Sequence, residues 1–285
     1  MLGSRSSSLI FILLCTSIFS KEIFSDVPIS AVEKFWDKKP CDIDFSQKPL
    51  SKAFFDEVEH FRYTTQTHIP EFAEFERWHG KKVLEIGCGI GTEAINFVQA
   101  GADYTAIELS GKSLDVTKKR FEIYGLNARL IHGNAEELDK YLGNEKFDLI
   151  WSHGVIHHSP HPERIIAQCE KILKPDSELR IMLYARVSVP VFRWMLDCKI
   201  LDLNRANELA ARNGETQANS PVTYTYTYSS IRRLLRNFDI ISMKKVIMGH
   251  ANFLEKVSQE EFKDLEEELG WFILIRAQLH NKGTV

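Results

Sequence analysis

The sequence lacks several features that would place it in a specialised class of protein. Its five cysteines are scattered over 285 residues and form no Cys-x-x-Cys pair, which argues against a disulfide framework and favours reduced thiols in a cytoplasmic protein. It has no internal repeat and no low-complexity tract. Its formal net charge is only -3, with an isoelectric point near 6.4, which argues against a nucleic-acid partner bound through broad electrostatics.

The sequence also lacks an apolar run long enough to span a bilayer. The longest candidate, residues 9–19, follows a short serine-rich start that contains Arg5. It has the length of a signal-peptide core and is too short for stable membrane insertion. Two interpretations of residues 1–28 remain open, a signal segment and a loosely attached tail.

What is present is ordinary globular composition, with 44% hydrophobic and 26% charged residues, enough for one domain of about 200–250 residues with additions. The most informative stretch is the apolar run 83–86, which passes directly into a loop with glycine at Gly87, Gly89 and Gly91. A short apolar run of this kind predicts a buried parallel strand. Glycine lets the loop backbone lie flat against a ligand. Because residues 92–99 continue as a helix, the stretch predicts a nucleotide-type site.

The glycine spacing distinguishes between two kinds of nucleotide. A dinucleotide fingerprint, Gly-x-Gly-x-x-Gly, would need glycine where this chain has Thr92. The observed spacing, with Glu85 two residues before the first glycine, resembles motif I of the class I S-adenosylmethionine (SAM)-dependent methyltransferases. A nicotinamide-dependent oxidoreductase shares the strand–loop–helix arrangement and remains the first alternative.

Strands and helices alternate through the middle of the chain. Strands are expected at 82–85, 104–108, 129–131, 147–151 and 179–184, and helices at 92–99, 113–124 and 163–173, an order that predicts right-handed βαβ units around a parallel sheet. Further strands at 238–246 and 271–277 flank an acidic helix at 258–269. The last strand resembles the antiparallel seventh strand of class I methyltransferases. The predicted fold is therefore α/β, a Rossmann-like sheet of seven strands with an antiparallel last strand and helices on both faces.

The predicted organisation has five parts. Residues 1–28 are the tail or signal segment, 29–80 a helical N-terminal cap, and 81–186 the SAM-binding Rossmann-like core. Residues 187–228, including a helix at 191–211, form a lid or substrate insertion, and 229–285 complete the core sheet. The cap contains Arg62, Tyr63 and His68, for which packing and surface roles are favoured over contact with the cofactor.

The resemblance assigns cofactor contacts to the carboxyl ends of the strands, where ligands bind in open α/β sheets. Glu108, after the second strand, would accept hydrogen bonds from both ribose hydroxyls, since a carboxylate is an acceptor with two oxygens. Asn134 stands where related enzymes usually have aspartate, so the adenine amino group would meet an uncharged acceptor. The complete set of expected cofactor-binding residues is Glu85, Gly87, Cys88, Gly89, Gly91, Glu108, Leu109, Asn134, Ala135 and Ser152.

Four histidines occur in residues 153–161, a stretch that resembles motif IV of the same family. No metal site is expected, because prolines at 160 and 162 interrupt any helix and too few of the rings can face one way. His157 is the first candidate for a general base and His153 the second, since a neutral imidazole suits proton removal near neutral pH. A hydrogen-bonded structural role is the alternative for each histidine.

The resemblance is to the ubiquinone/menaquinone-biosynthesis-like branch of small-molecule methyltransferases. It implies SAM as cofactor, a small-molecule acceptor methylated on oxygen, carbon or nitrogen, and a cytoplasmic location, and it leaves the acceptor and the oligomeric state open. Tyr184 is expected to face the sulfonium or to cap the core. Tyr224, Tyr226 and Tyr228 would share one face of an extended segment, as substrate contacts or in an edge strand. A non-catalytic SAM-binding protein and a protein or RNA methyltransferase are the remaining alternatives.

Overall fold

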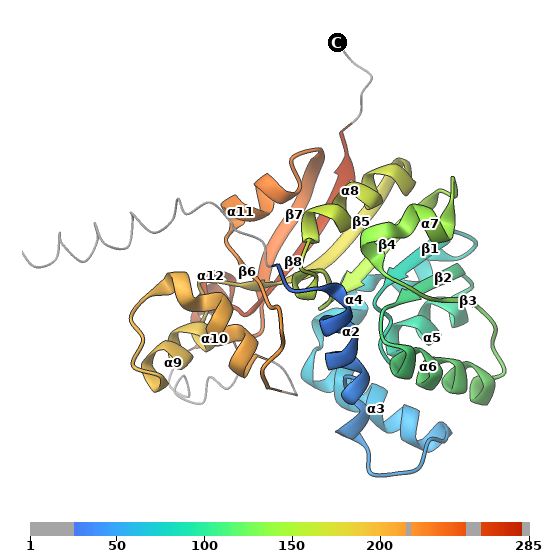
Figure 1. Cartoon of the computed structure of the whole chain (residues 1–285), viewed down its shortest axis with the longest axis horizontal. Coiled ribbons are helices and arrows are strands. Elements are labelled where there is room, and N and C mark those ends of the chain that lie inside the picture. Colours follow the sequence, from blue (N-terminus) through green and yellow to red (C-terminus); the bar gives the residue numbers. More distant parts are fainter. Residues whose placement is uncertain (1–25, 215–217, 249–257, 281–285) are drawn as a thin grey trace, which may run out of the picture.

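The computed structural model describes residues 26–214, 218–248 and 258–280 (Figure 1). The apolar run 9–19 lies outside these residues. Within the described ranges, no helix combines the length and the apolar character that crossing a bilayer requires.

A single sheet runs through the molecule (Figure 1), in the strand order β3-β2-β1-β4-β5-β8-β7, with a short β6 paired to β5. The strands β1 to β5 are parallel, and β8 is antiparallel to both β5 and β7. The predicted fold class, with its antiparallel last strand, is confirmed; the sheet has eight strands where seven were expected, because the short β6 pairs with β5. The strands are β1 (Lys82–Ile86), β2 (Asp103–Glu108), β3 (Arg129–His132), β4 (Phe147–His153), β5 (Leu173–Ala185), β6 (Thr225–Tyr226), β7 (Phe238–Val246) and β8 (Phe272–Leu279).

Helices surround the sheet and precede it. The α-helices are α2 (Ile29–Lys38), α3 (Lys52–Thr65), α4 (His68–Ala73), α5 (Thr92–Gln99), α6 (Gly111–Tyr124), α7 (Leu138–Leu142), α8 (Pro162–Ile172), α9 (Val189–Asp197), α10 (Ala206–Asn213), α11 (Tyr228–Leu234) and α12 (Gln259–Leu269). Short 3-10 helices are η2 (Ile43–Phe45), η3 (Phe75–Trp78), η4 (Ala135–Glu137), η5 (Ile156–His158) and η6 (Leu203–Arg205).

Both faces of the central strands are buried, as expected for a parallel sheet covered by helices. Val83 of β1 packs in one core with Phe97 of α5 and Trp151 of β4. Its neighbour Leu84 points to the opposite core, which includes residues from α7, α8 and α11. This alternation fixes which face of β1 meets each core, and therefore the direction in which the glycine loop leaves the carboxyl end of the strand.

The segment expected as one helix at 191–211 is instead two helices, α9 and α10, joined by η6. The chain leaves α9 at Lys199, which has a left-handed φ of 54°. The N–H of Ile200 then donates back to the carbonyl of Met195 at 2.8 Å, the reverse bond of a Schellman-type helix end. Because Ile200 packs against the core beside α9, burial of this side chain stabilises the break.

The sequence offers Ser229 or Ser230 as the cap of the next helix, but α11 begins earlier, at Tyr228, and is capped by Thr227. The side chain of Thr227 accepts from the N–H of Ser230, and the Ser230 hydroxyl accepts from the N–H of Thr227. This reciprocal capping box satisfies donors at the start of the helix, and it uses Ser230 as its third residue and not as its cap.

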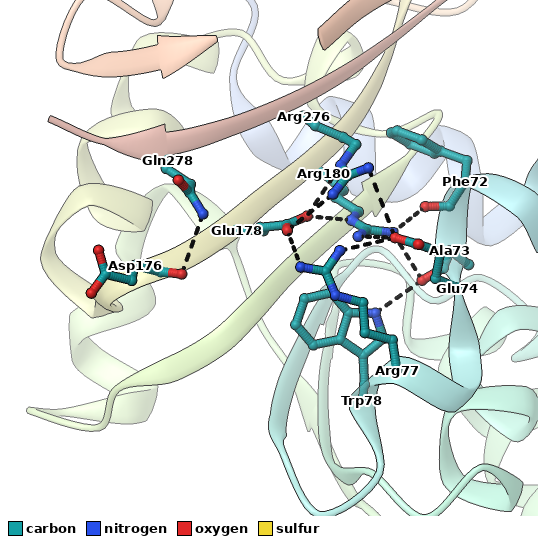
Figure 2. Close-up of polar contacts among 10 residues, drawn as sticks. All are labelled: Phe72, Ala73, Glu74, Arg77, Trp78, Asp176, Glu178, Arg180, Arg276 and Gln278. Carbon is teal, nitrogen blue, oxygen red and sulfur yellow. Dashed lines mark hydrogen bonds and ion pairs between the residues drawn. The ribbon is translucent and has the colours of Figure 1, made fainter. Parts of the chain in front are cut away.

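A buried cluster of charged residues ties the N-terminal cap to the sheet (Figure 2). Arg180 of β5 is fully buried and donates to the carbonyl of Phe72 at 2.6 Å and to the Glu178 carboxylate at 2.8 Å. Arg77 of η3 and Arg276 of β8 donate to the same carboxylate at 2.5 and 3.1 Å. The end of α4 is thus held by side chains from the middle of the sheet.

Candidate cofactor and active site

A cavity of about 280 Å³ opens at the carboxyl ends of the parallel strands. Its lining includes the glycine loop after β1, the ends of β2 and β3, and an aromatic side made of residues from the N-terminal cap, β5 and β8. The expected cofactor residues that line it are Gly87, Cys88, Gly89, Glu108, Leu109, Asn134 and Ala135, and His153 of the expected bases lines it too.

The glycine loop needs glycine for two different reasons. Gly87 has a φ of 77°, and a Cβ there would lie 2.4 Å from a Val155 methyl carbon, so the loop packs too closely for any side chain. Gly89 has a φ of 56°, and a Cβ there would meet no atom within 4 Å. Because Gly89 lines the cavity, its missing side chain leaves backbone exposed to a ligand.

Glu108 is fixed at the end of β2 by backbone donors. One carboxylate oxygen accepts from the N–H of Gly89 at 2.9 Å and the other from the N–H of Ser110 at 2.8 Å. Burial raises the pKa of Glu108, while the N–H groups of Ser110 and Gly89 oppose that rise. Each oxygen retains capacity for a further donor, so the carboxylate is oriented for a ligand in the cavity.

Asn134 lies at the end of β3 as expected, and its side chain has a structural task. The amide oxygen accepts from the N–H of Glu136 at 3.0 Å and thereby caps η4. The adjacent Ala135, and Leu109 at the end of the neighbouring strand β2, complete this part of the wall.

Three of the expected cofactor residues lie behind the cavity wall. Glu85 is buried and accepts from the Tyr104 hydroxyl, and burial together with the nearby Glu93 charge raises its pKa well above the ordinary value. The hydroxyl of Ser152 donates to the carbonyl of Ile86 at 3.2 Å. Gly91 is the N-terminal cap residue of α5. These three residues hold the loop and are not part of the cavity lining.

The two candidate bases occupy different positions. His153 lines the cavity, and its Nε2 lies 3.1 Å from the Nε2 of His68. His157 is fully buried behind the lining and packs on the Tyr184 ring with centroids 3.9 Å apart. Burial lowers the pKa of both His153 and His157 well below the usual value, so both rings are neutral at pH 7.

The lining also contains residues outside the expected cofactor set, of which Tyr184 had been expected either to face the sulfonium or to cap the core. Arg62 of α3 lines it while bonded to Asp42 at 2.7 Å and to Glu93 at 2.6 Å. The aromatic part of the lining consists of Trp36, Phe45, Tyr184, Trp271 and Phe272. Trp36 and Phe45 belong to the predicted cap, and Trp271 and Phe272 to the strand predicted at 271–277, so the sequence placed them in elements without showing that they meet at the cavity. Tyr224, Tyr226 and Tyr228 do not share a face on the cavity: Tyr226 is buried in the core and Tyr228 begins α11.

No metal centre is found in the described part of the chain, where no three histidine, cysteine, aspartate or glutamate side chains are grouped to hold an ion.

Comparison with known proteins agrees with this geometry. The model of a methyltransferase domain family matches residues 84–181. The ubiquinone biosynthesis O-methyltransferase of Actinobacillus pleuropneumoniae serotype 7 is 37% identical over 106 residues, which are 35% of this chain and 44% of that protein. That of Haemophilus ducreyi is 34% identical over 103 residues. The chain thus spans less than half the length of these relatives, and the similarity is centred on the core.

Two solved structures share the fold over most of the chain. The magnesium protoporphyrin IX methyltransferase of Synechocystis PCC 6803, solved with S-adenosylhomocysteine (SAH), has a TM-score of 0.57 and 14% identity, covering 88% of this chain and all of that one. The [4+2]-cyclase SpnF also has a TM-score of 0.57, with 13% identity and 91% and 99% coverage. A shared fold alone therefore does not fix the reaction. Residues 84–181 thus match a methyltransferase domain family, and the chain has the fold of the class I SAM-dependent methyltransferases.

Proposed function

We propose that this protein transfers a methyl group from SAM to a small-molecule acceptor. The observation that carries the proposal is the Glu108 carboxylate, held by the N–H groups of Gly89 and Ser110 beside the open glycine loop. The carboxylate is a buried hydrogen-bond acceptor at the end of β2, and the exposed loop backbone follows the neighbouring strand β1. A ligand in which a ribose is joined to a flat group requires this arrangement.

The other cavity residues fit SAM as well. Gln66 lines the cavity, and its buried side-chain oxygen has no hydrogen-bond partner among the described residues. An unsatisfied buried acceptor costs about 1–3 kcal/mol, and the ammonium of a methionyl group is a suitable donor. The space over Gly89 admits the ligand without displacing any side chain.

The acceptor would bind against the aromatic side of the cavity. When bound, SAM supplies an electrophilic methyl group, and the protein's main task is to align the acceptor with it, which contributes about 7–11 kcal/mol in favourable cases. Tyr184 stacks on Trp271 with centroids 4.3 Å apart, so these rings form a rigid wall for a flat molecule. Arg62 is neutralised by two carboxylates, which favours an uncharged acceptor.

For a hydroxyl acceptor, the residue proposed to take the proton is His153, because it lines the cavity and its ring is neutral at pH 7. His157, the first candidate from the sequence, is separated from the cavity by its neighbours. We retain it as the alternative that mutagenesis must exclude.

A small molecule is a better acceptor than a nucleic acid because the chain has a net charge of -3 and so no general attraction to phosphate. The proposal also places the protein in the cytoplasm, where SAM is made. A nicotinamide-dependent oxidoreductase and a non-catalytic SAM-binding protein are the alternatives to this proposal.

Thermal unfolding and calorimetry with SAM, SAH and NAD test the proposal. A ligand at 100 times its dissociation constant stabilises the folded state by about 2.7 kcal/mol, so SAM and SAH should raise the melting temperature and NAD should not. Stabilisation by NAD alone would favour the oxidoreductase. Binding of SAM without methylation of any member of a broad panel of phenols, amines and thiols would favour the non-catalytic alternative.

A further inference from the structure

A pair of histidines from distant parts of the chain meets at the edge of the cavity. His68 is the first residue of α4 and His153 the last residue of β4. Their Nε2 atoms are 3.1 Å apart, and their rings stack with centroids 5.4 Å apart and planes inclined by 26°. Both side chains are buried, with 7% and 8% of their surface exposed.

This contact restricts the protonation of both rings. Burial lowers the pKa of His68 to about 4 and that of His153 well below its usual value, so each ring carries one proton at pH 7. A hydrogen bond between two Nε2 atoms requires that one of them carries the proton and the other accepts it. His153 makes no second ring hydrogen bond within the described part of the chain.

The tautomer of His153 decides whether it can act as a base. If its Nε2 accepted from His68, its proton would be on Nδ1 and the ring would have no lone pair left for an acceptor's proton. If its Nε2–H donates to His68, the lone pair of Nδ1 remains available to take the acceptor's proton.

Resting on the proposed function, we propose that His68 is a positioning residue: it accepts the Nε2–H of His153 and holds the His153 Nδ1 in the basic form. In the proton transfer, the acceptor O–H proton moves to Nδ1 of His153. The oxygen electron pair forms the bond to the methyl carbon as the carbon–sulfur bond breaks toward sulfur. The imidazolium of His153 keeps its Nε2–H bond to His68 throughout. His68 thus does for His153 what an orienting partner does for any histidine base.

The unpartnered atom of His68 is consistent with a functional role. Its Nδ1 is buried and has no hydrogen-bond partner in the described residues, and in the proposed tautomer this atom carries the proton. Such unsatisfied buried groups are rare, and a catalytic role is one of the explanations for them.

The position of His68 is fixed from the other end of its helix. Arg180 donates to the carbonyls of Phe72 and Ala73 at 2.6 and 3.2 Å, as Figure 2 shows, which holds the last turn of α4 against β5. Phe272 of β8 contacts both histidine rings edge-on, with centroids 5.8 Å from His68 and 6.2 Å from His153. The pair is therefore set between the sheet and a clamped helix.

Nitrogen NMR of the full chain labelled with ¹⁵N-histidine, in the presence of SAH, tests the proposal. His153→Gln identifies the resonances of His153. We expect the wild-type protein to show His153 protonated at Nε2, and His68→Gln, which keeps an acceptor oxygen, to preserve that state. His68→Phe, which keeps a ring without an acceptor, should shift His153 to a mixture of tautomers.

The proposal is overturned if His153 is protonated at Nδ1 in the wild-type protein, or if His68→Phe leaves its resonances unchanged. Calorimetry with SAM on the same samples separates a failure of the His68 proposal from a failure of the proposed function. If the wild-type protein does not bind SAM, the proposed function is refuted, whatever the tautomer of His153. The expected outcome for both variants is a SAM dissociation constant within twofold of the wild-type value, because His68 does not line the cavity.

Discussion

The backbone N–H of Gly89 donates to the carboxylate of Glu108 across 2.9 Å. This bond joins the loop after β1 to the end of the neighbouring strand, so a change at either residue alters the shape of both. It also sets the carboxylate in place before a ligand arrives, which reduces the entropy that binding would otherwise cost.

Glu108→Gln should weaken SAM binding about 10- to 100-fold, equivalent to about 1.5–3 kcal/mol for a hydrogen bond to a charged group. The amide NH₂ would also face one of the two backbone donors that Glu108 now satisfies. Isothermal titration calorimetry measures the effect. Glu260→Gln, on the exposed start of α12, is the matched control, and equal affinity in both variants would remove Glu108 from the site.

SAM binding should weaken as the pH falls through the raised pKa of Glu108. Burial raises that pKa above 4.5, so the folded protein takes up a proton more readily than the unfolded chain. The resulting contribution to stability is complete below the unfolded pKa and is lost as the pH rises through the folded pKa. Cofactor binding needs the ionised form and should release a proton in this range. Calorimetry in buffers of different ionisation enthalpy detects the release, which Glu108→Gln should abolish.

Gly89→Ala should reduce SAM affinity at least tenfold with a smaller effect on folding. The left-handed φ of 56° costs a residue with a side chain about 1–2 kcal/mol, and the new methyl group would enter open space in the cavity. Gly125→Ala, which has a φ of 65° and open space at the end of α6, carries the same strain away from the site. A similar loss of affinity in both variants would show that strain alone is responsible.

His153→Gln should lower methyl transfer to a hydroxyl acceptor by about 10²–10⁴, the usual contribution of a general base, with little change in SAM affinity. His157→Leu should retain activity, because that ring does not line the cavity. Release of SAH is the measurement, with melting temperatures to establish that both variants fold. The opposite pattern would restore His157 as the base.

Arg180→Met should destabilise the protein by about 3–5 kcal/mol, since it leaves the buried Glu178 carboxylate with fewer partners. Arg193→Met removes an exposed ion pair to Asp197 at 3.8 Å and should change stability by less than about 1 kcal/mol. Urea unfolding of both variants makes the comparison. Equal midpoints would mean that the cluster in Figure 2 does not hold the cap.

The parts of the fold that depend on local sequence were predicted well. The strand before Gly87 and the helix after it follow from neighbouring residues, and β7 (Phe238–Val246) was predicted to the residue. The break at Lys199 was missed because it is stabilised by burial of Ile200 against the core, a tertiary effect that helical spacing does not contain.

The same distinction separates the predicted from the unpredicted parts of the site. Glu108 was placed at a strand end by the alternation of strands and helices, and it lies there. The order of preference between His157 and His153 could not come from spacing, since it depends on η5 turning one ring behind the cavity wall. The contact of His68 with His153 could not be predicted for a similar reason. The two residues are 85 positions apart, and their contact is set by how α4 docks.

Because β8 lies between β5 and β7 in the sheet but follows both in the sequence, different parts of the cavity are synthesised at different times. The glycine loop and Glu108 belong to segments made early, as do Trp36 and Phe45 of the aromatic lining, whereas Trp271 and Phe272 come with β8, the last of the described strands to be synthesised. During synthesis the nascent chain would therefore complete the glycine loop and the end of β2 before it completed the aromatic lining of the cavity. Under the proposed function, the donor site is made before the acceptor site is whole.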